Sequence, residues 1–251
     1  VLLRNGGKLP FILGAAFSLV LAALAHFLTI DDSFRLFGTK ITLSSTFQIL
    51  GRKIVLTAAD QPLLVFLFVS LFLWILFALM LWPHRLFPGT AFGFISLMLA
   101  SFAVETMLYS VLLIELSLLF AIPILNPPGH QTGSGLKRMV IFLTLALPFF
   151  LIGDWLFEAT GMNPSDSNLQ IISLALIGFS FVLWLAIFPF HTWLPQLSEE
   201  ANPISFGYVM SIFFTMLVLN VVKFINSSRM ISETPEIFNA VLLIGAVSTL
   251  F

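Results

Sequence analysis

Residues 62–82 read PLLVFLFVSLFLWILFALMLW, a run of 21 residues without a charged side chain. A helix of about 20 apolar residues crosses the hydrocarbon core of a bilayer, which is about 30 Å thick. The whole chain has this character, because 59% of its 251 residues are hydrophobic and only 9% are charged. A soluble domain carries about 25% charged residues. The sequence therefore predicts an all-α integral membrane protein that needs lipid or partner subunits around it.

Further apolar runs on both sides of this segment predict a single transmembrane domain over residues 1–251, with about eight spans. The run from Thr90 to Leu125 is too long for one helix, and Glu105 divides it into two. The predicted spans are 10–30, 62–82, two within 90–125, 137–157, 169–190, 204–225 and one that begins near residue 237. The opening LLRNGGK and the closing VLLIGAVSTLF predict a segment of a longer protein, and a natural terminus within the membrane is the alternative.

The polar stretch 31–61 carries seven charged residues of both signs and predicts an extramembrane loop. Alternating polar and apolar residues in KITLSSTF (40–47) indicate a short strand or hairpin there. Short loops rich in Lys and Arg usually face the cytoplasm. We therefore place one set of basic residues there: Arg4, Lys8, Arg85, Lys137 and Arg138. The short loops of the opposite side, around Glu105 and Asp166, carry none.

The composition also excludes several kinds of site. The chain has no cysteine, which excludes disulfides, thiolate zinc sites, iron–sulfur clusters and thioether-linked haem. Its four histidines lie far apart in the sequence, so we expect no metal site in this chain. No basic cluster exceeds two adjacent residues, so we expect no nucleic-acid partner.

Ionisable side chains are costly in lipid, so each one inside a predicted span is a candidate functional group. Glu115 lies near the middle of its span, with no other charge within nine residues. Desolvation favours its neutral form unless water or a cation reaches it. It could relay protons, or it could be a protonated acid bonded to a neighbouring helix. The other candidates lie nearer helix ends or in the segment described below: His26, Glu105, Asp154, His191 and Lys223.

Three of these candidates have a structural alternative. Asp154 and Glu158 are four residues apart and share a helix face, so they could belong to a proton path or mark the exit of the helix. Glu105 is expected near a helix end, where water can reach it. Lys223 could extend its ammonium group to the interface or face inward and pass protons on.

Residues 188–203, FPFHTWLPQLSEEANP, are the most unusual part of the chain. They include three prolines: Pro189, Pro195 and Pro203. These prolines cannot all lie within one regular helix, and irregular backbone at membrane depth is tolerated only where protein or a water-filled cavity surrounds it. We interpret the segment as a broken helix, a feature that recurs at transport sites. His191 could exchange protons near neutral pH. The alternative is an interfacial loop anchored by Trp193.

PFHTWLP (189–195) followed by EEANPIS (199–205) resembles the proline–histidine–tryptophan segment of the antiporter-like subunits of respiratory complex I. The same family includes the large subunits of Mrp-type sodium/proton antiporters and of membrane-bound hydrogenases. The resemblance implies an inverted-repeat bundle of about fourteen helices, of which this chain covers helices two to nine. It also implies that Glu115 is the family's helix-five glutamate, that His191 is the motif histidine, and that Lys223 matches a basic residue near the end of helix eight.

The chain departs from the family pattern at two lysines. The family has a lysine seven residues before the motif histidine, where this chain has Trp184. It has another in the middle of the following helix, where our alignment gives Thr215. A lysine beside the glutamate would stabilise the carboxylate anion. Without it, Glu115 is expected to be mostly protonated, and the resemblance implies impaired or rerouted pumping.

The resemblance implies a proton-translocating membrane subunit of an NADH:quinone oxidoreductase-like complex, with no catalytic chemistry of its own. Alternatives are a sodium/proton antiporter subunit, a structural subunit that has lost transport and, outside the family, a stand-alone solute transporter. The expected partners are other membrane subunits, lipids, and protons or sodium ions. This chain is expected to hold no cofactor, while flavin, iron–sulfur clusters and quinone would belong to partner subunits. The expected location is a bacterial inner membrane.

Overall fold

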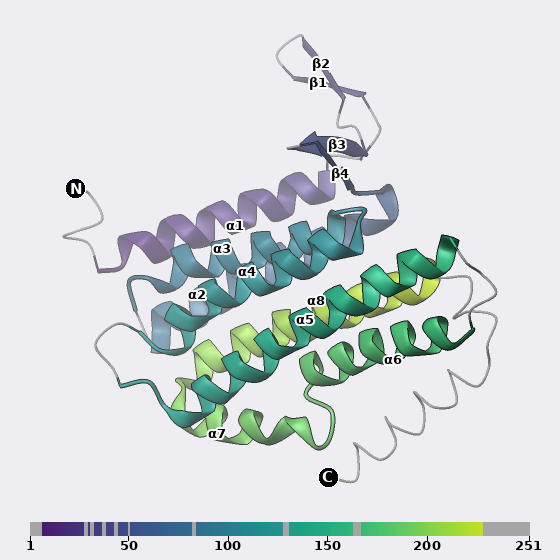
Figure 1. The fold of residues 1–251 in the computed structure, drawn as a ribbon. Helices are drawn as coiled ribbons and strands as arrows, with labels where there is room; N and C mark the ends of the chain where they lie inside the picture. The colour runs from purple at the N-terminus through teal and green to yellow at the C-terminus, as the bar shows by residue number, and fades with distance from the viewer. Residues whose placement is uncertain are drawn as a thin grey trace.

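The computed structural model describes residues 7–27, 30, 33–36, 39–42, 45–49, 51–81, 84–127, 131–162 and 167–227. Helices dominate this part of the chain, and its four short strands are confined to residues 33–55 (Figure 1). The helices are α1 (Leu9–Phe27), α2 (Gln61–Leu81), α3 (Phe87–Ala103), α4 (Met107–Leu125), α5 (Ser134–Met162), α6 (Ser167–Trp184), α7 (Trp193–Glu200) and α8 (Pro203–Ser227). Two short 3-10 helices, η2 (Ala58–Asp60) and η3 (Phe190–Thr192), precede α2 and α7.

Among the described residues, five helices are long and apolar enough to cross a membrane: α1, α2, α4, α5 and α8. Two shorter apolar helices, α3 and α6, accompany them. Seven of the predicted spans therefore coincide with helices, and the span expected near residue 237 lies outside the described residues. The remaining helix, α7, lies inside the proline-rich segment. The chain is a multi-pass integral membrane protein.

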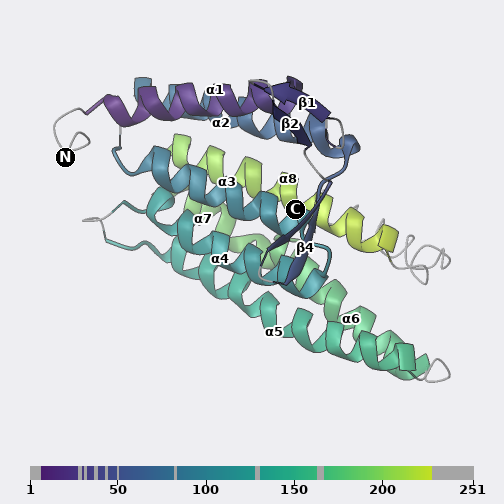
Figure 2. The same cartoon turned by 90° about the horizontal axis from the view of Figure 1, so that it is seen from above.

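Consecutive helices pack in pairs, α1 with α2, α3 with α4 and α5 with α6. Figure 2 shows α1 and α2 on one side of the bundle and α5 and α6 on the opposite side. Helix α8 lies between them and packs against α2, α3 and α4. Its Tyr208 is buried, and its ring meets Phe87 and Phe94 of α3 and Trp74 of α2. The Tyr208 hydroxyl donates a 2.7 Å hydrogen bond to the carbonyl of Ala91.

Helix boundaries follow local chemistry. The split at Glu105 is confirmed, because α3 ends at Ala103 and α4 begins at Met107. Helix α8 begins with Pro203, a residue suited to the first helical position, and the side-chain oxygen of Asn202 accepts the N–H of Ile204 at 2.9 Å. This is the bond of an N-cap.

The polar stretch forms two antiparallel hairpins. Strand β1 (Ser33–Leu36) pairs with β2 (Thr39–Thr42), and β3 (Thr46–Ile49) pairs with β4 (Arg52–Val55). Strand structure within 40–47 is confirmed, but its residues belong to β2 and β3 of different hairpins. The second hairpin is attached to the turn between α3 and α4. A β-bridge joins Ile54 to Val104, and the N–H of Glu105 donates to the carbonyl of Lys53 at 3.1 Å.

Candidate functional site

Helices α6 and α7 lie one after the other along α5 (Figure 1). Contacts along α5 give their order. Gly153 packs against Ile177 of α6, the Trp184 indole at the end of α6 binds the Leu143 carbonyl, and Gly135 packs against Leu197 of α7. The backbone between α6 and α7 therefore faces the N-terminal half of α5. Phe190 within this break meets Phe142 of α5, with 5.8 Å between ring centroids.

Helix α6 ends at Trp184, so its predicted extension to residue 190 is wrong. Ala186 adopts a left-handed conformation with φ of 51°. The N–H of Ala186 binds the Leu183 carbonyl at 3.2 Å, and the N–H of Ile187 binds the Val182 carbonyl at 3.0 Å. This pair of bonds is the Schellman motif, which ends a helix and usually has glycine at the left-handed position.

The three prolines lie where the missing N–H is tolerated. Pro189 precedes η3, Pro195 lies in the first turn of α7, and Pro203 is the first residue of α8. His191 lies in η3, is partly exposed, and its ring lies 5.8 Å from that of Phe188. Trp193 is fully buried, and its indole N–H has no hydrogen-bond partner among the described residues.

Glu115 projects from α4 toward α5. The hydroxyl of Thr144 donates a 2.7 Å hydrogen bond to its Oε1. Its Oε2 is enclosed and has no partner within the described part of the chain. Pro148 lies four residues after Thr144 inside α5, and its lack of an N–H deprives the Thr144 carbonyl of its usual helical bond. Thr144 directly follows Phe142 and Leu143, so Glu115 is bonded to the stretch of α5 that also contacts the helix break.

The two positions where the family has lysine are occupied differently. Trp184 is fully buried, its indole donates to the Leu143 carbonyl at 3.0 Å, and its ring packs against Phe150 and Phe181. Trp184 therefore binds α5 at Leu143, the residue before the Thr144 that binds Glu115. Thr215 is partly exposed on α8.

Lys223 binds the C-terminal end of α3. Its ammonium group donates to the carbonyls of Phe102 at 2.6 Å and Val104 at 2.8 Å. A cation is favourable at this end of a helix, where backbone carbonyls lack partners. Lys223 is thus half-buried between α8 and α3, at the end of the bundle that carries the hairpins.

A buried polar cluster beside Lys223 was not predicted. Asn220 of α8 accepts the Ser110 hydroxyl of α4 at 3.0 Å, and its amide reaches the Ser101 hydroxyl of α3 at 3.4 Å. All three residues are buried. Asn220 thus joins three helices through polar bonds in an apolar core. The available sequence signal was an asparagine inside the apolar run LVLNVV.

The remaining candidates lie near helix ends or on the surface. Glu105 is 60% exposed, and its carboxylate lies 4.0 Å from the Lys53 ammonium group. Asp154 is partly exposed on α5, with Glu158 one turn further on. His26 is exposed in the last turn of α1, and its carbonyl accepts the Gln61 amide at 3.0 Å.

The prediction that the ionisable candidates are buried is wrong for the part of the chain that the structure describes. No Asp, Glu, Lys, Arg or His in its described ranges is buried, and Glu115, His191 and Lys223 are each partly exposed. The reason is geometric, because neighbouring helices of this chain cover only part of each side chain. Among the described residues, no group of three or more His, Asp or Glu side chains could hold a metal ion.

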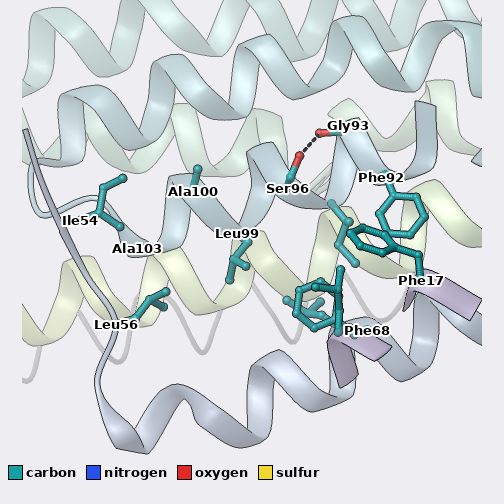
Figure 3. Close-up of a pocket in the computed structure, with 13 residues that line it drawn as sticks. Phe17, Ile54, Leu56, Phe68, Phe92, Gly93, Ser96, Leu99, Ala100 and Ala103 are labelled. Atoms are coloured by element: carbon teal, nitrogen blue, oxygen red, sulfur yellow. Dashed lines mark hydrogen bonds between the residues drawn. The ribbon is translucent and has the colours of Figure 1, made fainter. Parts of the chain in front are cut away.

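A separate cavity of about 450 Å³ lies among α1, α2, α3 and β4 (Figure 3). Its walls are apolar side chains such as Phe17, Phe68 and Leu99. The Ser96 hydroxyl among them already donates to the Gly93 carbonyl at 3.0 Å. None of the residues that line this cavity is acidic or basic.

Comparison with known proteins supports the resemblance to complex I subunits. The chain is 31% identical over 136 residues to NAD(P)H-quinone oxidoreductase chain 4 1 of Picosynechococcus sp., covering 48% of this chain and 25% of that protein. It is 34% identical over 110 residues to NADH-ubiquinone oxidoreductase chain 5 of Bos indicus, covering 43% and 17% respectively. Part of this chain is homologous to the antiporter-like subunits of complex I. The homology is distant, and no family model matches the chain.

A third relative extends the same pattern. NAD(P)H-quinone oxidoreductase chain 4 1 of Synechococcus elongatus is 32% identical over 118 residues, covering 41% of this chain and 22% of that protein. The chain spans about a quarter or less of the length of these antiporter-like subunits of complex I.

Proposed function

We propose that this chain is part of a proton-translocating membrane subunit of an NADH:quinone oxidoreductase-type complex, with Glu115 as its central proton carrier. The supporting observation is the place of Glu115, whose carboxyl group is bonded to Thr144 in the stretch of α5 that also contacts the helix break. Its enclosed Oε2 has no partner among the described residues, so one carboxyl oxygen remains to carry a proton.

His191 in the break and Lys223 at the hairpin end are the further relay groups of this proposal, and Glu105 and Asp154 would connect them to the aqueous sides. Trp184 and Thr215 stand in place of the family lysines, and the partner of Glu115 among the described residues is the Thr144 hydroxyl. Proton transfer through Glu115 is therefore expected to be weakly coupled to the rest of the complex. Flavin, iron–sulfur clusters and quinone would be held by partner subunits, and the host would be a bacterial inner membrane.

A structural subunit without transport is the second candidate. Trp184 favours it, because the buried indole occupies the end of α6 and is fixed to α5 by its bond to Leu143. A packed aromatic ring at that position leaves less room for water beside Glu115 than a lysine would.

The experiment measures proton uptake by membrane vesicles that contain the complete complex, driven by its own electron donor. Glu115→Gln retains the shape of the side chain and removes its titratable proton, so we expect a measurable fall in the number of protons moved per electron at equal complex content. Glu199→Gln, an exposed change on α7, is the matched control and should have no effect. Equal proton uptake in the Glu115→Gln and control vesicles would support the structural subunit. Repeating the assay with a sodium gradient tests the antiporter alternative.

A further inference from the structure

The last residue of α7 is bonded to the first residues of α5. The Glu200 carboxylate accepts the Ser134 hydroxyl at 3.0 Å and the backbone N–H of Gly135 at 2.9 and 3.1 Å, one distance to each oxygen. Free N–H groups at a helix N-terminus carry partial positive charge, so a carboxylate is favoured there. The contact joins residues 65 and 66 positions apart in sequence.

Two glycines make room for this contact. A Cβ on Gly133 would lie 2.0 Å from the Glu200 Oε2, and a Cβ on Gly135 would lie 2.5 Å from the backbone nitrogen of Leu197. A larger residue at Gly135 would push the backbone of α7 away from α5, and one at Gly133 would displace the Glu200 carboxylate. The two glycines of TGSG (132–135) therefore allow the end of α7 to come close to α5. Gly135 contacts the backbone of α7, and Gly133 contacts the Glu200 side chain.

The Glu200 contact is one of two attachments between α5 and the residues that flank the helix break. On one side of the break, the Trp184 indole is bonded to Leu143 of α5. On the other side, Glu200 is bonded to Gly135 of the same helix. The backbone between them is thus attached to α5 at both ends. Glu115 is bonded to Thr144, next to the first of these attachments.

We propose that Glu200 is a positioning residue whose carboxylate holds α7 against the N-terminus of α5 and so keeps the helix break against the stretch of α5 that bonds Glu115. Its effect on proton transfer rests on the function proposed above, whereas its effect on the position of α7 does not. Without the carboxylate, α7 would remain in contact with α5 through apolar side chains such as Leu197, which do not fix its distance from Gly135.

None of the charged side chains described near this contact makes a bond to the Glu200 carboxylate. Lys137 and Arg138 of α5 and Glu199 of α7 are exposed, and the ring of His191 in η3 lies 5.8 Å from that of Phe188. The hydrogen bonds of the Glu200 carboxylate go instead to Ser134 and Gly135. The backbone N–H of Gly135 is the main cause that holds the pKa of Glu200 below its ordinary value.

The absence of cysteine from this chain allows a direct test with single cysteines. Leu197→Cys places a thiol at a buried position under the contact, and Ser198→Cys places one at an exposed position next to it. Each variant is labelled with a membrane-permeant maleimide in the complete complex, and the modification is read on this chain by its mass.

We expect Glu200→Ala to raise the labelling rate of Leu197→Cys at least several-fold while leaving that of Ser198→Cys unchanged. Glu200→Gln still accepts hydrogen bonds, so its labelling rate at Leu197→Cys should lie between the rates with Glu200 and with Glu200→Ala. Glu199→Ala should not change the labelling rate. An unchanged labelling rate in the Glu200→Ala protein would overturn the proposal. Proton uptake in the same vesicles separates the two ideas: faster labelling with unaltered uptake supports the role of Glu200 in holding α7 and contradicts the transport role of the break.

Discussion

Asn220 offers a quantitative test of what holds the centre of the bundle together. It is 1% exposed, and its side chain makes bonds to Ser110 at 3.0 Å, to the Met216 carbonyl at 3.0 Å and to Ser101 at 3.4 Å. Replacing it with leucine removes the two bonds to other helices and puts a somewhat larger apolar side chain in place of the amide. A hydrogen bond between membrane helices contributes about 0.6 kcal/mol on average and up to about 1.7.

The 3.0 Å bond to Ser110 should lie in the upper part of this range and the longer bond to Ser101 in the lower part. We therefore expect Asn220→Leu to lower the free energy of unfolding by about 1–2 kcal/mol. The assay is reversible unfolding of the full-length protein in mixed micelles, with the exposed Asn226→Leu as control. A double-mutant cycle of Asn220→Ala with Ser110→Ala should give a coupling of about 0.5–1.5 kcal/mol. Strict additivity would refute the reasoning that this bond stabilises the core.

Three further predictions use the same unfolding assay. Ala186→Val should lower stability by about 1–3 kcal/mol, because a β-branched residue is strained at a φ of 51°, whereas Ala186→Gly should be tolerated. Equal stability of the two variants would count against a left-handed end to α6. Lys223→Met should cost about 1–2 kcal/mol by leaving the Phe102 and Val104 carbonyls without their donor, and Lys223→Arg should recover part of it. The lowered pKa of Glu200 stabilises the fold at neutral pH, and this contribution should disappear as the pH falls through that lowered value. In Glu200→Gln, acid should therefore cost less stability than in the unchanged protein, and identical acid profiles would contradict the bond to α5.

The helices were predictable because apolar runs of membrane length leave few alternatives. The runs ending at residues 82 and 225 end within two residues of α2 and α8. The charge of Glu105 marked the turn between α3 and α4, and alternation marked the strands. The end of α6 was missed because Leu185, Ala186 and Ile187 are all apolar, and glycine, the usual sign of a left-handed helix end, is absent.

The sequence could indicate which residues belong to the site, but not which contacts they make. Glu115 could be chosen because a lone carboxylate in an apolar run is costly, but its bond to Thr144 depends on how α4 and α5 pack. The bond between Glu200 and Gly135 joins residues too far apart in sequence for any local pattern, although two glycines in TGSG indicate a close approach. The degree of burial was misjudged because it depends on neighbours that no single helix specifies.

The bond between Glu115 and Thr144 also fixes how far Glu115 lies from the charged residues toward the two ends of α5. Charged residues of α5 leave an uncharged stretch between Arg138 and Asp154, a rise of about 24 Å. Thr144, which binds Glu115, lies about 9 Å from Arg138 and about 15 Å from Asp154 along this axis. A proton that reaches Glu115 from the Asp154 side would therefore cross roughly 60% of a voltage applied over this stretch, worth about 1.4 kcal/mol per 100 mV. The shorter remaining step would carry the smaller share, so voltage should act more strongly on transfer from the Asp154 side.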